Sequence, residues 1–237
     1  MKIIKELEKI SCGSVEQPKE ILNTDQYFSC PIYWIDKPEW VDELNKSSDP
    51  FIKEAKDNNK KIMKERAKQY GEKKDHGMVH HSKPLMNQPG FIELQNWILA
   101  TAYNLLNEQG YDLTNHKLFL TEFWVQEFSK IGGGHHSLHT HWNGHISGFY
   151  FLKGSDFTSS PVFNDPRAGR MMNLLPEKDE KKITMASSQI HYKVKPGRLI
   201  LFNSFMPHLF SVDSGYEPFR FIHWNIQAIS KGVLNVV

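Results

Sequence analysis

A cluster of histidines is the part of this sequence best suited to chemistry. Five of the twelve histidines fall within residues 135–145, and two of them, His139 and His141, are separated by one residue. In a β-strand, side chains two residues apart point to the same face, so these two imidazoles can meet at one point. A third imidazole, His208, follows 67 residues after His141. Two ligands close in sequence and one distant ligand predict an open metal site on a β-rich scaffold.

Three imidazoles on one face can bind a divalent transition metal, and they leave coordination positions open for catalysis. The alternative is that these histidines only decorate a polar surface loop. The one-residue spacing follows a glycine run at 132–134, and the third histidine follows a later strand-like segment, which favours the metal site. We therefore predict His139, His141 and His208 as metal ligands and as the catalytic centre.

Arg220 is a second candidate for chemistry. It lies twelve residues after His208, on the next expected strand. An arginine inside a barrel is costly unless it pairs with an anion, and its guanidinium matches a carboxylate with two hydrogen bonds. The alternative is an arginine on the surface or in a structural salt bridge.

The first half of the chain is expected to be mostly helical. Residues 32–36 form a short apolar run that predicts a strand, and residues 38–72 predict surface helices broken near 47–50. Residues 91–109 have helical spacing of apolar side chains, and Gly110 stands where a helix-ending glycine belongs. We expect this helix to pack against one face of a sheet.

From residue 117 the pattern changes to short strands separated by turns. Strands are expected at 118–128, 145–152, 160–163, 191–194, 199–202, 209–212 and 219–229. Such a series is typical of a sandwich or a barrel. Residues 154–190 are polar and charged, and we interpret them as a mobile loop over the site.

Composition narrows the class of protein. At 237 residues the chain is long enough for one domain, which we expect to span 1–237, with 1–116 as a mostly helical support and 117–230 as the catalytic core. The net charge of +2 indicates neither a nucleic-acid nor a membrane partner. Two cysteines, Cys12 and Cys30, predict no disulfide framework. The N-terminus lacks the apolar run of a signal peptide, so we expect a cytoplasmic protein.

Several motifs together resemble a known family. Gly133 precedes the His139-x-His141 pair by six residues, the segment Ser-Gly-Phe-Tyr-Phe-Leu follows at 147–152, and Pro196-Gly197 precedes the distal histidine. This order is similar to that of the iron(II)- and 2-oxoglutarate-dependent oxygenases. It is closest to a small bacterial and phage branch with prolyl-hydroxylase-like members, marked by H-x-H-x-N, SGxYYL and DPR motifs. The resemblance covers roughly residues 118–228.

The resemblance implies a mainly β protein with flanking helices, in which a double-stranded β-helix (a jelly roll or cupin-like barrel) is packed by the N-terminal helices. It implies iron(II) held by His139 and His208, with 2-oxoglutarate and O₂ as cosubstrates. Arg220 would anchor the 2-oxoglutarate carboxylate, and Tyr150 and Gln126 would contact the cosubstrate.

The sequence departs from the family pattern at one position, because His141 stands where these enzymes carry the acid of a 2-His-1-carboxylate triad. Three interpretations follow. His141 ligates the metal, it stands aside and water completes a two-histidine site, or Asp165 approaches from another strand. We favour His141 as a ligand.

The family resemblance predicts a hydroxylase that acts on an unidentified substrate, either a small molecule or a peptidyl side chain such as proline. Two other classes stay open. One is a three-histidine cupin-type metalloenzyme that does not use 2-oxoglutarate, and the other is a non-catalytic jelly-roll binding module. Arg220 is the discriminating feature, because a 2-oxoglutarate-dependent hydroxylase needs it beside the metal and a three-histidine enzyme without 2-oxoglutarate does not. The oligomeric state is not predicted.

Overall fold

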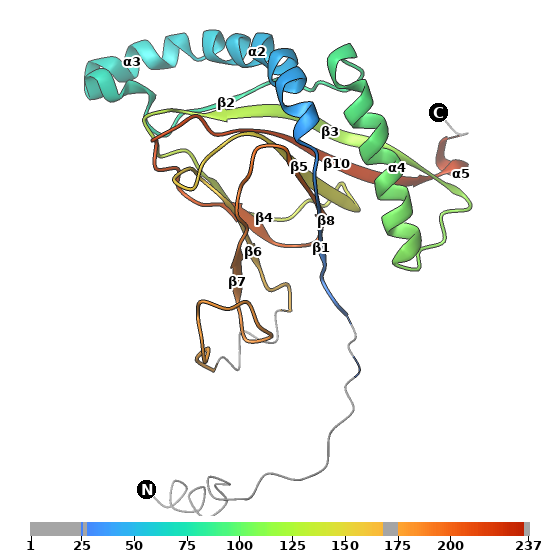
Figure 1. The fold of residues 1–237 in the computed structure, drawn as a ribbon. Helices are drawn as coiled ribbons and strands as arrows, with labels where there is room; N and C mark the ends of the chain where they lie inside the picture. The colour runs from blue at the N-terminus through green and yellow to red at the C-terminus, as the bar shows by residue number, and fades with distance from the viewer. Residues whose placement is uncertain (1–24, 26–27, 168–174, 235–237) are drawn as a thin grey trace, which may run out of the picture.

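The computed structural model describes residue 25 and residues 28–167 and 175–234, drawn in colour in Figure 1. Cys12 and the N-terminal residues used to judge a signal peptide lie outside these described residues. Within them, ten strands form two antiparallel sheets, and helices cover one sheet. Cys30 is a free cysteine.

The larger sheet has six strands in the order β1–β8–β5–β10–β3–β2. Their bounds are β1 Ile32–Asp36, β8 Arg198–Asn203, β5 Ile146–Lys153, β10 Arg220–Ser230, β3 His116–Phe128 and β2 Val79–His81. The N-terminal strands β1 and β2 thus form the two edges of this sheet. The central strand β10 pairs with β3 and β5, which lie about a hundred and about seventy residues earlier in the chain.

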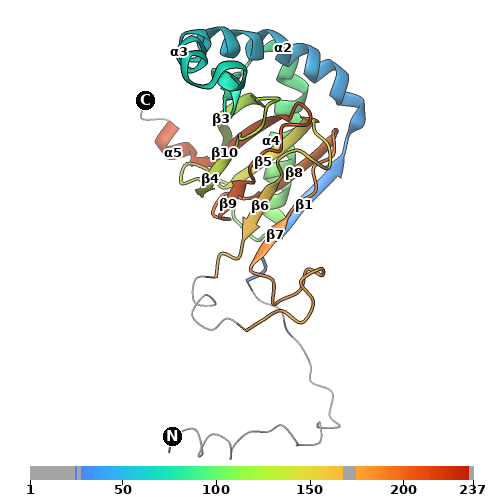
Figure 2. The same cartoon turned by 90° about the vertical axis from the view of Figure 1, so that its left-hand side faces the viewer.

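The smaller sheet has the order β4–β9–β6–β7. Its strands are β4 His136–His139, β9 His208–Phe210, β6 Pro161–Asn164 and β7 Gln189–His191. They are short, and they lie beneath the larger sheet in Figure 1 and in front of it in Figure 2. Aromatic side chains fill the space between the two sheets, mainly phenylalanines of β3, β5, β9 and β10.

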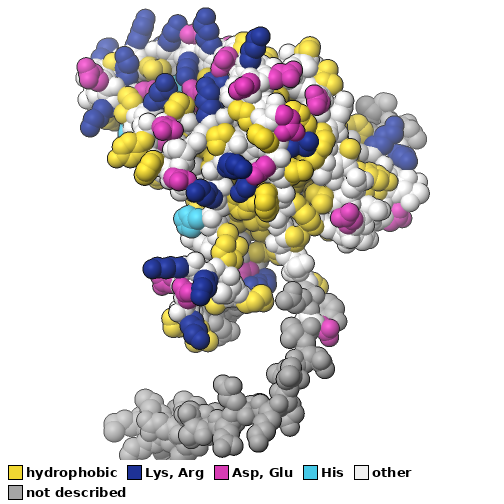
Figure 3. Space-filling model, viewed as in Figure 1, with side chains coloured by type: hydrophobic (Ala, Val, Ile, Leu, Met, Phe, Trp, Pro, Cys, Tyr) yellow, Lys and Arg dark blue, Asp and Glu magenta, His cyan; other side chains and the backbone are white. Residues whose placement is uncertain are grey.

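Helices cover the other face of the larger sheet. α2 Val41–Asn58 and α4 Ile92–Glu108 pack on this face. The other helices are α3 Lys60–Tyr70, which has no buried residues, the 3-10 turns Pro38–Trp40, Gly71–Asp75 and Pro89–Phe91, and a short C-terminal helix α5 Lys231–Leu234. Leu44 and Ile52 of α2 and Ile98 of α4 share one hydrophobic core with Ile222 and Trp224 of β10. Each face of the larger sheet is therefore packed. Lys and Arg side chains are spread over α2 and α3 among acidic ones (Figure 3), as expected of a solvated helical face.

Two helix predictions have different outcomes. The helix at 91–109 is confirmed, and Gly110 has a φ of 93°, the left-handed conformation that a helix-ending glycine adopts at low cost. The predicted break near 47–50 is wrong, because α2 continues through Pro50 and ends at Asn58. Burial of Leu44 and Ile52 on either side of the proline stabilises the helix across the lost backbone hydrogen bond.

The predicted fold class is confirmed at the level of a mainly β protein with antiparallel sheets and helices. A closed barrel is not seen among the described residues, so the jelly-roll assignment stays a prediction. The segment 154–190 contains β6 and the start of β7. Residues 168–174 of this segment lie outside the described residues. No helix in the described ranges has the length and apolar character needed to span a membrane.

Candidate metal centre

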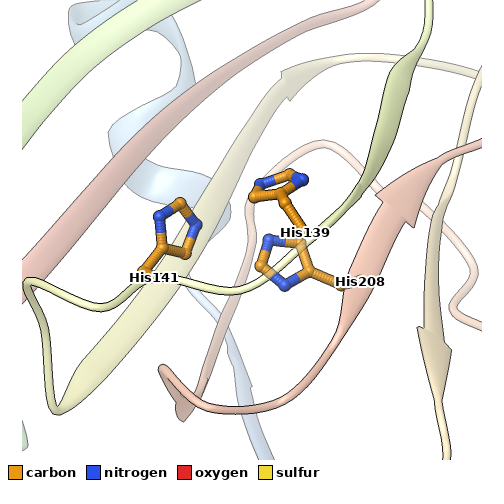
Figure 4. A group of neighbouring side chains, drawn as sticks. All are labelled: His139, His141 and His208. Atoms are coloured by element: carbon orange, nitrogen blue, oxygen red, sulfur yellow. The ribbon is translucent and has the colours of Figure 1, made fainter.

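Three imidazoles converge in the space between the two sheets. Each of His139, His141 and His208 offers one ring nitrogen, and these nitrogens lie within 4.8 Å of one another. The ring centroids of His139 and His208 are 4.4 Å apart, and those of His141 and His208 are 5.2 Å apart. Figure 4 shows the three rings gathered around one point. The predicted grouping of these residues is therefore present, and their role as ligands stays a prediction.

Strand pairing brings two of the three together. His139 is the last residue of β4 and pairs directly with His208, the first residue of β9. His141 lies two residues beyond the end of β4, so strand alternation does not hold it. Its backbone N–H donates a hydrogen bond to the Ser204 carbonyl (3.0 Å), which ties this segment to the turn before His208.

The hydrogen bonds of His139 and His208 leave Nε2 of each ring free for a metal. His139 Nδ1 lies 2.7 Å from the Ser137 carbonyl, and His208 Nδ1 lies 3.0 Å from the Met206 carbonyl. Since a carbonyl only accepts, both Nδ1 atoms carry the proton and both Nε2 atoms keep a lone pair. His208 Nε2 is buried and has no hydrogen-bond partner. A buried polar atom without a partner is costly, and a metal ion would satisfy it.

His141 depends on the amide of Asn225, which lies 3.0 Å from its Nδ1. An amide can present its oxygen or its nitrogen to the ring. With the oxygen facing the ring, Nδ1 donates, and Nε2, which is buried without a partner, keeps its lone pair. In the structure the Asn225 nitrogen faces Nδ1, and its oxygen accepts a hydrogen bond from Ser147 Oγ (2.6 Å). Turning the amide over exchanges the two atoms, and Ser147 Oγ can then accept from the Asn225 nitrogen and donate to Ser204 Oγ (2.8 Å). With the amide in that orientation, all three imidazoles fit a metal ion through Nε2.

Burial keeps the imidazoles of His141 and His208 neutral. It lowers the pKa of His208 to about 3, with smaller contributions from the neighbouring histidines, against the hydrogen bond to the Met206 carbonyl, which raises it. Burial and then the nearby His223 lower the pKa of His141 to about 3. A histidine must be neutral to bind a metal, so both are ready to do so at neutral pH.

Arg220 does not face the histidines, and the predicted orientation is wrong. Its Nε and one terminal nitrogen lie 2.8 and 2.7 Å from Glu127 Oε2, and its other terminal nitrogen lies 2.7 Å from Asp49 and 3.2 Å from the Asn45 side chain. Glu127 is the cross-strand neighbour of Arg220 on β3, and Asp49 and Asn45 belong to α2. Alternation along β10 places Arg220 and Ile222 on the same face of the strand. Ile222 lies on the helix side with Arg220, as part of the core shared with α2 and α4.

The other predicted cosubstrate residues lie on opposite faces of the sheet. Tyr150 belongs to the core beneath the helices, and its hydroxyl donates to the Lys37 carbonyl (2.6 Å). It is therefore not beside the metal centre, and its predicted contact with the cosubstrate has no support here. Gln126 is fully buried, and its side chain hydrogen-bonds His136 Nε2 (2.7 Å) on β4, so it faces the space between the sheets. Its contact with a cosubstrate stays a prediction.

Two functional candidates were missed by the sequence analysis. One is His223, whose ring centroid lies 4.9 Å from that of His141. Glu122 lies beside it on β3, and the proximity of the His223 imidazole lowers the pKa of this carboxyl to about 2. Asp165, the acid considered from the sequence, belongs to neither group of potential ligands found among the described residues, and Arg167 binds both of its oxygens (2.9 and 2.7 Å).

Comparison with known proteins links this site to a family. Residues 122–217 match the model of a family described as "Putative 2OG-Fe(II) oxygenase". The resemblance predicted from the sequence is thereby confirmed over these residues, and the family implies Fe(II), 2-oxoglutarate and O₂. The matched range contains all three histidines and ends before Arg220. No curated protein matches the chain.

Several solved structures are similar to this one at low sequence identity. A 2OG-Fe(II) oxygenase family oxidoreductase from Burkholderia pseudomallei is 9% identical, with a TM-score of 0.44. The similarity covers 63% of this chain and 66%, just under two thirds, of the Burkholderia protein. A Pseudomonas putida prolyl-4-hydroxylase is 10% identical with a TM-score of 0.44, over 83% and 92%. A prolyl hydroxylase from Trichoplax adhaerens, in complex with a hypoxia inducible factor peptide fragment, is 13% identical with a TM-score of 0.47, over 86% of each chain.

Proposed function

We propose that this protein, matched over residues 122–217 to the 2OG-Fe(II) oxygenases, is a non-haem iron(II)- and 2-oxoglutarate-dependent dioxygenase that hydroxylates its substrate. The observation that carries the proposal is the convergence of three imidazoles. The hydrogen bonds of His139 and His208 leave Nε2 free, and Nε2 of His141 is free when the Asn225 amide presents its oxygen to Nδ1. His139, His141 and His208 would hold the iron. Three ligands would leave positions open for the cosubstrate and O₂.

The surroundings of the histidines suit oxidation chemistry. When bound, iron and 2-oxoglutarate would supply the oxidising step, and the protein would supply geometry and exclude water. Phe202 and Phe149 lie against the His208 ring, with centroids 4.9 and 5.7 Å away, and both are buried. These aromatic walls hold the His208 ring in place and keep water from its buried side.

The predicted anchor for 2-oxoglutarate does not fit this arrangement. Arg220 is the only buried lysine or arginine among the described residues, and it already pairs with Glu127 and Asp49 on the helix side of the sheet. This observation favours a second candidate function, a three-histidine metalloenzyme that does not use 2-oxoglutarate. The two candidates share the metal ligands and differ in the cosubstrate.

One experiment separates the candidates. The iron(II)-loaded full chain is supplied with 2-oxoglutarate and O₂, and succinate formation and O₂ consumption are measured, with His208→Ala as the metal-free control. The first candidate predicts O₂-dependent succinate that is lost in the control. Bound iron without any succinate, while 2-oxoglutarate fails to perturb the metal, would reject the first candidate and leave the second.

The substrate would be a small molecule or a peptidyl side chain. We also propose that residues 1–237 form a single domain with residues 117–230 as its core, arranged as a double-stranded β-helix. Support comes from two antiparallel sheets that share an aromatic interior, with the first part of the chain contributing helices and both edge strands of the larger sheet.

A further inference from the structure

A second group of potential ligands adjoins the three histidines and shares one of them. Glu122 on β3, His223 on β10 and His141 each offer one atom, and these atoms lie within 4.8 Å of one another. Neighbouring strands bring the acid and the new histidine together, since β3 and β10 pair along their whole length. Their side chains face the same interior as the three-histidine group.

The His223 ring has a ring nitrogen available to bind a metal. Its Nδ1 lies 3.1 Å from the Gly148 carbonyl, so Nδ1 donates and Nε2 keeps its lone pair. His223 is 1% exposed, and its Nε2 has no hydrogen-bond partner. A fully buried imidazole nitrogen without a hydrogen-bond partner is costly, and a metal ion in front of it would satisfy it.

The carboxylate opposite this nitrogen lies at a distance typical of two ligands on one ion. Glu122 Oε2 is 3.7 Å from His223 Nε2, which is too long for a hydrogen bond. Two atoms that each bind one metal at about 2.1 Å lie roughly 3 to 3.5 Å apart, so a small adjustment would place an ion between them. Glu122 Oε1 accepts a hydrogen bond from Asn143 Nδ2 (3.1 Å), which orients the carboxylate.

We propose that Glu122, His141 and His223 form a second divalent-metal position with the 2-His-1-carboxylate composition, alternative to the three-histidine position. The two positions compete for His141, because its Nδ1 is engaged by Asn225 and only Nε2 remains. A metal ion therefore occupies one position or the other. The mixed position supplies an anionic oxygen, which suits Mn(II) as well as Fe(II), whereas three imidazoles suit Fe(II), Zn(II), Ni(II) and Cu(II).

The test measures metal binding alone, so it is independent of whether the protein uses 2-oxoglutarate. The full-length double variant His139→Ala/His208→Ala removes two ligands of the first position and none of the second. We expect it to bind one Mn(II) ion per chain, as measured by metal analysis after equilibrium dialysis. Adding Glu122→Gln to the double variant should abolish Mn(II) binding, and so should adding His223→Gln. His135→Ala, at an exposed histidine in neither group, is the control and should change nothing.

Circular dichroism checks that each variant is folded before metal is measured. A folded double variant that binds no Mn(II) or Co(II) would overturn the proposal, and so would an ion that survives both Glu122→Gln and His223→Gln. The wild-type chain should bind a single ion at saturation. Two ions in the wild type would overturn the competition for His141.

Discussion

Asn225 decides which nitrogen His141 offers to a metal. The amide lies 3.0 Å from His141 Nδ1, is fully buried, and is itself held by Ser147. A partner of this kind sets the tautomer and the orientation of a ligating histidine. The proposed metal centre therefore extends one residue beyond the three histidines, onto β10.

Replacing Asn225 tests this dependence. Asn225→Asp supplies an obligate acceptor to Nδ1–H and should keep metal affinity at or above the wild-type level. Asn225→Leu removes the acceptor and should weaken metal affinity by roughly 10- to 100-fold. Competition titration with a chelating indicator measures both. Ser204→Ala, which removes only the far end of the hydrogen-bond chain, is the control. Equal affinities for the leucine and aspartate variants would show that Asn225 has no such role.

At the scale of the elements, the ion pairs of Arg220 join α2 to the larger sheet. Arg220 and Glu127 are each 3% exposed, so removing Arg220 leaves a buried carboxylate that keeps only the ion pair with Lys56 (2.6 Å) among the described residues. We expect Arg220→Leu to lower the free energy of unfolding by about 3 kcal/mol, as measured by urea denaturation. Metal affinity should stay unchanged. A rise in the KM for 2-oxoglutarate without loss of stability would instead restore Arg220 as the cosubstrate anchor.

Close contact between β5 and β10 depends on Gly148. A Cβ atom at this position would lie 2.5 Å from the Ile200 carbonyl and 2.5 Å from the Trp224 ring. Gly148→Ala should therefore destabilise the protein by about 1 to 3 kcal/mol, as measured by its thermal midpoint. Gly232→Ala is the matched control, because its nearest neighbour is 3.7 Å away, and it should leave the midpoint unchanged or slightly raised. Similar losses for both variants would contradict the close contact.

At the scale of the whole molecule, the buried histidines make stability depend on pH. Burial lowers the pKa of His136 to about 4 and the pKa values of His141 and His208 to about 3, whereas in the unfolded chain they titrate near 6.5. Between these values the unfolded chain binds protons that the folded chain does not. Their contribution to stability is therefore fully present above about pH 6.5 and is lost as pH falls toward 3.

We therefore expect the metal-free protein to unfold at progressively lower urea concentrations as the pH is lowered from 7 to 4. Each histidine contributes up to about 1.4 kcal/mol per pH unit in this range. His208→Asn should flatten the dependence, even though it lowers stability at pH 7. An identical slope in the variant and the wild type would refute the assignment of this dependence to His208.

The sequence by itself determined the pair His139 and His141, because its signal is local. Two histidines one residue apart, after a glycine run, can be recognised without knowing any partner strand, and the helix at 91–109 is likewise defined by its own periodicity. The phase of β10 could not be predicted. Its residues 220–226 are all buried, because helices pack on one face and the smaller sheet lies against the other. A strand buried on both faces has no polar side to show which residues point where. Only the tertiary structure therefore decided that Arg220 faces the helices and that His223 and Glu122, a hundred residues apart, meet beside His141.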